Sequence, residues 1–127
     1  MTQKKTRVVV VGAGPIGLAV AAEIHKRSDL QLTAVVDVDP TKLGQRVNGT
    51  VVVGASFDDV SADVAVVCTT SSFVNVAPTV RECLRRRWHV VSTCEELVWP
   101  FAAHKELAAL VDDEAVFAGR AVVGTGV

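Results

Sequence analysis

The sequence lacks the features that would point to a membrane, secreted or nucleic-acid-binding protein. No apolar run approaches the roughly 18–20 residues needed to span a bilayer, and residues 1–5, Met-Thr-Gln-Lys-Lys, contain no apolar signal region. The formal net charge is only −1, so no general electrostatic attraction to nucleic acid or to an anionic membrane is expected. These absences predict a cytoplasmic protein with neither kind of partner.

Cysteine is also scarce. Cys68, Cys83 and Cys94 are odd in number and do not have the spacing of metal ligands. This pattern predicts reduced thiols rather than a disulfide framework, and it disfavours a zinc site. At 127 residues, half of them hydrophobic, the chain is long enough for one domain over residues 1–127 with a substantial core, but short for two.

A run of four valines leads directly into a glycine-rich turn. Residues 8–11 have the uninterrupted apolar character of a buried parallel strand, and Gly12, Gly14 and Gly17 follow with the spacing of a dinucleotide-binding turn. The first glycine allows a sharp turn, the second lets the backbone approach a pyrophosphate, and the third lets the helix pack closely. Pro15 suits the start of a helix, where its missing donor costs nothing. The predicted cofactor-contacting residues are Gly12, Gly14, Pro15, Ile16 and Gly17.

An acidic residue stands at the distance that this motif requires. Residues 30–36 predict a second strand that ends in Asp37, about 20 residues after Gly17, where a carboxylate meets the adenosine ribose hydroxyls. A carboxylate there repels a 2′-phosphate, so NAD(H) is favoured as cofactor. NADP(H) stays open, because Lys42 or Arg46 would offset that repulsion. The alternative for Asp37 is an ordinary strand-end carboxylate that caps the turn at Thr41.

The rest of the chain alternates between strands and helices. This order predicts an α/β fold of Rossmann type, a doubly wound parallel sheet of about six strands in the order 3-2-1-4-5-6 with helices on both faces. Pro78 is expected just inside the start of its regular helix. The predicted further strands are 50–53, 63–68, 88–92 and the stretch from 120, and the predicted helices are 15–27, 73–87 and about 100–113. The residues expected to face inward are Ile16, Ala19, Val20 and Ile24, then Val76, Val80, Cys83 and Leu84, then Leu107, Leu110 and Val111.

Two polar loops follow strands at their carboxyl ends, where ligands bind in open α/β sheets. The hydroxyls and amides of Thr69, Thr70, Ser71 and Ser72 are candidate ribose or phosphate contacts, and Ser72 is equally a candidate helix cap. Glu95 or Glu96 is a candidate contact to cofactor or substrate, the alternative being a cap on the helix that follows. Cys94 has no evident base or cation beside it, which disfavours a nucleophilic role.

Several of these motifs together resemble a known family. They are Gly12 to Gly17 with Asp37, Cys68-Thr69-Thr70-Ser71, Val90 to Leu97 and Gly124-Thr125-Gly126-Val127. The chain is similar over its whole length to the N-terminal domain of dihydrodipicolinate reductase-like proteins, and most similar to their 2,4-diaminopentanoate dehydrogenase-like branch. The resemblance implies hydride transfer between a nicotinamide and an imine or amine-bearing carbon of a small amino-acid-like substrate. It also places the loop at Thr69–Ser72 beside the cofactor and the loop at Glu95–Glu96 on the nicotinamide side.

The resemblance further implies a second, C-terminal α+β domain that supplies most of the substrate site and the contacts of a homo-oligomer. That domain is absent from these 127 residues, so we expect the isolated chain to bind the cofactor without catalysing the reaction. Two alternatives stay open. In the first, the chain is a non-catalytic nucleotide sensor or regulatory module. In the second, it binds a flavin, because the sequence Gly-Ala-Gly-Pro-Ile-Gly also opens many FAD domains.

Overall fold

The computed structural model describes residues 4–49 and 51–125, with the side chain of Val52 left out. The chain folds as two compact units, residues 1–68 and residues 69–127. The first unit contains β1 (Thr6–Val11), α1 (Pro15–Lys26), β2 (Leu30–Val36), β3 (Arg46–Val47), β4 (Val51–Gly54) and β5 (Val64–Val67). The second contains α2 (Phe73–Arg85), β6 (His89–Ser92), the short 3₁₀ helix η1 (Glu95–Val98), α3 (Lys105–Ala118) and β7 (Val122–Gly124).

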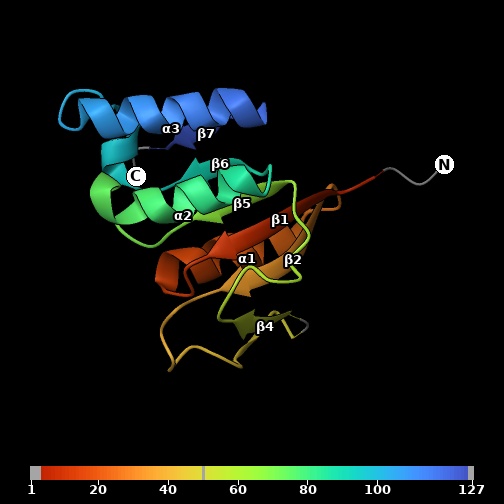
Figure 1. Cartoon of the computed structure of the whole chain (residues 1–127). Coiled ribbons are helices and arrows are strands. Elements are labelled where there is room, and N and C mark those ends of the chain that lie inside the picture. The colour runs from red at the N-terminus through yellow and green to blue at the C-terminus, as the bar shows by residue number, and fades with distance from the viewer. Residues whose placement is uncertain (1–3, 50, 126–127) are drawn as a thin grey trace. The chain divides into compact units, whose positions relative to one another are not determined.

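The strands of the first unit lie in the order β3-β4-β2-β1-β5 (Figure 1). β1 pairs in parallel with β2 on one side and with β5 on the other, and β2 pairs in parallel with β4. In the second unit β6 and β7 pair in parallel, with Val90 opposite Val122. The predicted strand order is therefore confirmed within each unit.

β3 is a strand that the sequence did not predict. It is only two residues long and pairs antiparallel with β4, with Val47 opposite Val51. The connection uses Asn48 and Gly49, whose φ angles of 54° and 76° lie in the left-handed region that asparagine and glycine tolerate best. The Asn-Gly signal correctly marked a turn, but two residues are too few to show the alternation that identifies a strand.

The core of the first unit is built from the valines of its strands and from one side of α1. Val8, Val10, Val35 and Val53 are buried, and Ile24 of α1 packs with them. The predicted inward positions Ile16 and Ala19 are wrong, because both are exposed. Gly17, Ala21 and Ile24 are the residues of α1 that are buried, since the close approach at Gly17 rotates that side of the helix toward the sheet.

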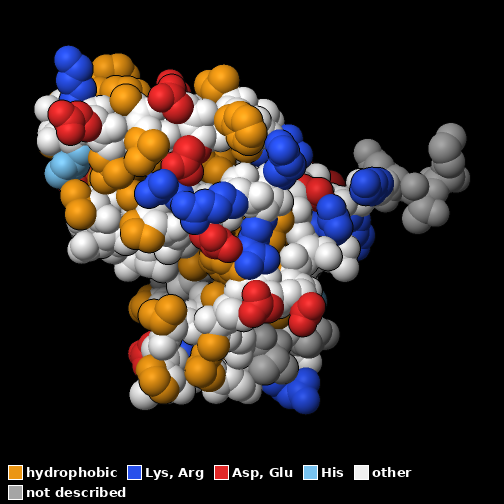
Figure 2. Space-filling view, in the orientation of Figure 1, with side chains coloured by type: hydrophobic (Ala, Val, Ile, Leu, Met, Phe, Trp, Pro, Cys, Tyr) orange, Lys and Arg blue, Asp and Glu red, His pale blue; other side chains and the backbone are white. Residues whose placement is uncertain are grey.

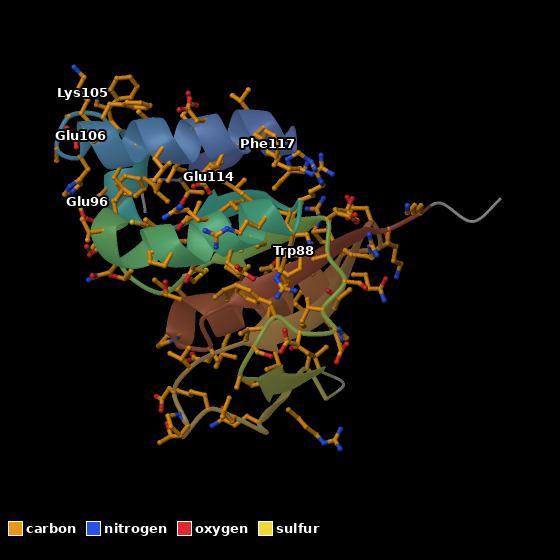
Figure 3. The ribbon with its side chains drawn as sticks, in the orientation of Figure 1. Trp88, Glu96, Lys105, Glu106, Glu114 and Phe117 are labelled. Atoms are coloured by element: carbon orange, nitrogen blue, oxygen red, sulfur yellow. The ribbon has the colours of Figure 1, made fainter. Side chains whose placement is uncertain are left out.

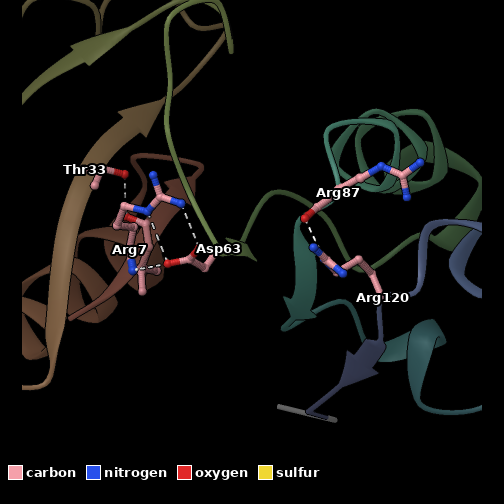
Figure 4. A network of polar contacts seen from close by, with 6 residues as sticks. Arg7, Thr33, Asp63, Arg87 and Arg120 are labelled. Carbon is pink, nitrogen blue, oxygen red and sulfur yellow. Dashed lines mark hydrogen bonds and ion pairs between the residues drawn. The ribbon is translucent and has the colours of Figure 1, made fainter. Parts of the chain in front are cut away.

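A polar contact fastens β5 beside β1 within the first unit. The Asp63 carboxylate accepts the backbone N–H of Arg7 at 2.8 Å and the Arg7 guanidinium at 2.9 Å (Figure 4). These contacts lower the pKa of Asp63 to about 2. The carboxylate therefore stays ionised at neutral pH and stabilises the pairing of the two strands.

In the second unit α2 packs against α3, and the Arg81 guanidinium donates to the Glu114 carboxylate at 2.7 Å between them. The Arg120 side chain donates to the Arg87 carbonyl at 2.6 Å (Figure 4). The predicted inward residues of α2 are all buried: Val76, Val80, Cys83 and Leu84.

Two expectations about these helices are wrong. α2 begins at Phe73, the start predicted for this helix, but Pro78 lies five residues further on and not just inside the helix start. Capping side chains fix that start, and the second turn accommodates Pro78 because the proline is exposed. α3 begins at Lys105 rather than near Pro100, because residues 100–103 form turns and the amide of Ala108 is the first to reach back to His104.

The face of α3 that points inward also differs from the predicted one. Its buried residues are Ala108, Val111, Ala115 and Ala118, so that small side chains let the helix pack closely. The predicted core residue Leu110 is 41% exposed, and Val116 and Phe117 are exposed as well. Figure 2 shows hydrophobic side chains on the outside of α3, at the top of the view. No helix in the described part of the chain combines the length and the apolar character that crossing a bilayer requires.

Candidate functional site

The glycine turn joins β1 to α1, and each glycine has a separate structural reason. Gly12 has a φ of 105°, a conformation that side chains disfavour, and its N–H donates to the Val36 carbonyl at 2.8 Å. A Cβ atom on Gly17 would lie 1.8 Å from the Gly12 carbonyl oxygen, so only glycine fits there. A Cβ on Gly14 would meet nothing within 4 Å. Packing therefore explains Gly12 and Gly17, whereas the space in front of Gly14 is open to a ligand.

The N-terminus of α1 carries free hydrogen-bond donors. Gly14 is the N-cap and offers no side chain, and the first helical position is Pro15, as predicted. The first backbone bond of the helix runs from the Leu18 N–H to the Gly14 carbonyl at 2.9 Å. Among the described residues, no acceptor takes the N–H groups of Gly14, Ile16 and Gly17. Free amides at the positive end of a helix dipole form a binding site for an anion such as a phosphate.

Asp37 lies against this turn. Its Oδ2 atom accepts the N–H of Ala13 at 2.7 Å, and its Oδ1 atom accepts the N–H of Asp39 at 2.8 Å. The side chain is half-buried at the end of β2. The structure therefore brings the predicted carboxylate and the predicted glycine turn together within the first unit.

The turn after β2 is capped by a different carboxylate. Asp39 accepts both the N–H and the hydroxyl of Thr41, at 3.0 and 2.9 Å, and these bonds lower the pKa of Asp39. The alternative function considered for Asp37, capping at Thr41, thus falls to Asp39. Lys42 adds a smaller electrostatic contribution to the lowered pKa, which places its positive charge near this carboxylate.

The N-terminus of α2, in the second unit, is occupied by the protein's own side chains. Ser72 is the N-cap and accepts the N–H of Asn75 at 3.4 Å, while the Thr70 hydroxyl accepts the N–H of Ser72 at 3.1 Å. Glu96 of η1, labelled in Figure 3, accepts the N–H of Phe73, and the two atoms lie 2.8 Å apart. The predicted capping role of Ser72 is confirmed.

Glu96 is the capping residue that sequence reasoning placed on the wrong helix, because it caps the preceding helix α2 and not the one that follows. Its other oxygen lies 3.3 Å from the His104 Nε2 atom, and the His104 ring packs against Phe73 with centroids 5.9 Å apart. The Phe73 amide, with a contribution from His104, lowers the pKa of Glu96. A cap 23 positions away along the chain leaves no local signal in the sequence.

The remaining candidates in the second unit differ in accessibility. Thr69, Ser71 and Glu95 are exposed, and their side chains have no bonding partner among the described residues. Cys94 is fully buried, and burial raises the pKa of its thiol, which agrees with the expectation that it is no nucleophile. Burial also raises the pKa of Cys83, to about 12.

Comparison with solved structures first defines the class of fold: a Rossmann-type α/β domain. The structure of amine dehydrogenase from Mycobacterium smegmatis matches with a TM-score of 0.87 at 23% identity, over 97% of this chain and 40% of that one. GenD2 from gentamicin A biosynthesis, solved in complex with NAD, matches with a TM-score of 0.69 at 20% identity, over 98% of this chain and 35% of that one. The predicted fold class is confirmed.

The family follows from a second comparison. The model described as CoA binding domain matches residues 3–93, and the chain belongs to this family. Among curated proteins, 2,4-diaminopentanoate dehydrogenase from Acetoanaerobium sticklandii is 29% identical over 98% of this chain, and the match covers 38% of that protein. This similarity confirms the resemblance inferred from the motifs. The chain therefore spans about two fifths of the length of this dehydrogenase and of the amine dehydrogenase.

Proposed function

We propose that the chain is the NAD(H)-binding part of an oxidoreductase that acts on an amine or imine carbon. The observation that carries this proposal is the arrangement at α1, where three amides lack an acceptor among the described residues, the space at Gly14 is open, and a carboxylate is anchored to the same turn. A pyrophosphate supplies negatively charged acceptors for these amides, and an adenosine ribose supplies hydroxyl donors for a carboxylate. One dinucleotide satisfies both requirements.

The same carboxylate explains the proposed preference for NAD(H). Each oxygen of Asp37 accepts one backbone N–H, and a carboxylate oxygen has a further lone pair for a ribose hydroxyl. A phosphate on the ribose of NADP(H) would meet the charge of Asp37 and of the neighbouring Asp39. Lys42, whose charge acts on Asp39, offsets part of that repulsion, so we propose weaker binding of NADP(H) rather than its exclusion.

The chemistry is proposed for the longer protein to which such a domain belongs. When bound, the nicotinamide supplies or accepts a hydride. The names of the two relatives, an amine dehydrogenase and 2,4-diaminopentanoate dehydrogenase, support a substrate in which a carbon bears nitrogen. Thr69, Ser71 and Glu95 stay predicted cofactor contacts, and their side chains are exposed and unpaired among the described residues.

The test is a titration of the 127-residue chain with NADH, NADPH and coenzyme A, followed by calorimetry. We expect NADH to bind more tightly than NADPH. No heat of binding at millimolar NADH would overturn the proposal. Absence of turnover by this chain with bound NADH would not, because the proposed substrate site belongs to the longer protein.

Coenzyme A is a second candidate, because the family to which the chain belongs is described by that ligand. Its adenosine diphosphate would fit the same free amides, but its ribose carries a 3′-phosphate that would meet the Asp37 carboxylate. We therefore expect coenzyme A to bind more weakly than NADH. The reverse order would favour a module that binds coenzyme A over an oxidoreductase domain.

A further inference from the structure

Asp37 forms hydrogen bonds within the chain itself, and these bonds do not depend on a ribose. In the cofactor-free chain both of its carboxylate oxygens are already engaged, one by the N–H of Ala13 and the other by the N–H of Asp39. Ala13 is fully buried between two glycines of the turn. A buried N–H that lacks an acceptor is costly, so the bond at 2.7 Å contributes to the stability of the turn itself.

Two successive amides of the turn are thus tied to the end of β2. The Gly12 N–H donates to the Val36 carbonyl at 2.8 Å, and the Ala13 N–H donates to the Asp37 carboxylate. Between them these bonds fix the path of the backbone just before Gly14. The free amides of the site begin at Gly14, so their direction depends on this anchoring.

We infer that Asp37 is a positioning residue for the glycine turn, in addition to any contact with a ribose. It holds the turn in the conformation that binds a diphosphate before the nucleotide arrives. The inference rests on the proposed function, since it concerns the same site. It predicts that loss of Asp37 weakens binding of a nucleotide diphosphate even when that nucleotide has no ribose hydroxyls.

The test compares ADP with 2′,3′-dideoxy-ADP as probes for the whole 127-residue chain and for Asp37→Ala. If Asp37 contacted only the ribose, the substitution would weaken the binding of ADP and leave the binding of the dideoxy nucleotide unchanged. If it positions the turn, both nucleotides bind more weakly, with a loss of about tenfold for the dideoxy probe. Removal of a negative charge would by itself strengthen diphosphate binding, so a loss has the opposite sign to the electrostatic effect.

Asp39→Ala is the matched control. It removes an equal charge two residues away, and the Asp39 carboxylate bonds to Thr41 rather than to the glycine turn. We expect affinity of this variant for the dideoxy probe to equal or slightly exceed that of the parent chain. Asp37→Asn preserves the size of the side chain and loses one of its two acceptors, so it should fall between parent and Asp37→Ala.

The amide resonance of Ala13 provides an independent readout without nucleotide. We expect it to move upfield in Asp37→Ala and Asp37→Asn, and to stay in place in Asp39→Ala. Dideoxy-ADP affinity of Asp37→Ala within about twofold of the parent would overturn the inference and leave the proposed function intact. Failure of the parent chain to bind ADP and NADH would overturn the proposed function, and the inference with it.

Discussion

The N-termini of α1 and α2 differ in what happens to their backbone N–H groups. At α2 the amides of Phe73 and Asn75 are taken by Glu96 and Ser72. At α1 the N-cap is Gly14, no acidic residue stands in the first turn, and the amides of Gly14, Ile16 and Gly17 have no acceptor among the described residues. A helix end that serves stability is capped by its own side chains, whereas an uncapped end gives up that stabilisation and remains available to a ligand.

The largest effect is expected from Gly17→Ala. The added Cβ would lie 1.8 Å from the Gly12 carbonyl oxygen, so α1 must move away from the turn. Overpacking of this kind costs about 3 kcal/mol. Chemical denaturation should show the lower stability, and NADH binding should be lost with it. Unchanged stability would mean that α1 does not approach the turn as closely as the structure has it.

Gly14→Ala separates ligand binding from stability. Its φ of −78° is accessible to alanine, and the new Cβ meets nothing within 4 Å, so the free energy of unfolding should change by at most about 0.5 kcal/mol. Because the methyl group stands where a pyrophosphate would approach, NADH affinity should fall by about tenfold or more. Calorimetry on the folded variant measures this affinity. An NADH affinity equal to that of the unsubstituted chain would show that Gly14 does not belong to the site.

Asp37→Ala should weaken NADH by about tenfold, since a hydrogen bond to a charged group is worth about 1.5–3 kcal/mol. NADPH should lose less, because the substitution also removes repulsion of its 2′-phosphate. The ratio of the two affinities, measured side by side, is therefore expected to move toward NADPH. An equal loss of affinity for both nucleotides would show that Asp37 does not contact the ribose and acts only through its bond to the glycine turn.

Glu96→Ala should lower the Tm by a few degrees, because α2 loses the charged cap on the Phe73 amide. The pKa of Glu96 is lowered in the folded chain, so its stabilising effect is complete above the ordinary pKa of 4.5 and is lost as the pH falls through the lower folded value. The difference in Tm between parent and variant should accordingly shrink in acid. A difference that persists below this range would show that the charge contributes nothing.

The smallest effect is expected from Ser72→Ala. The cap bond to the Asn75 amide is long, 3.4 Å, so its loss should cost about 0.5–1 kcal/mol by chemical denaturation. A loss well above 1 kcal/mol would mean that Ser72 does more at this helix start than accept that one N–H.

The first unit was more predictable from the sequence than the second. Gly12, Gly14, Gly17 and Asp37 could be placed because they belong to a motif of known spacing, even though the bond from the Ala13 N–H to Asp37 spans 24 positions. The cap of α2 by Glu96 spans a similar 23 positions, but no motif links Glu96 to the Phe73 amide, so it could not be placed. The start of α3 was misplaced for a similar reason, since Pro100 looks like a helix start and packing of Ala108 and Val111 decides otherwise.

The most direct test of the comparison follows the backbone amides of the 127-residue chain by NMR during titration with NADH. We predict that the amide resonances of Gly14, Ile16 and Gly17 move most among those of α1 and its turn, while those of Lys26 and Arg27 at the other end of the helix stay in place. If millimolar NADH leaves all three unmoved, the open end of α1 is not a nucleotide site.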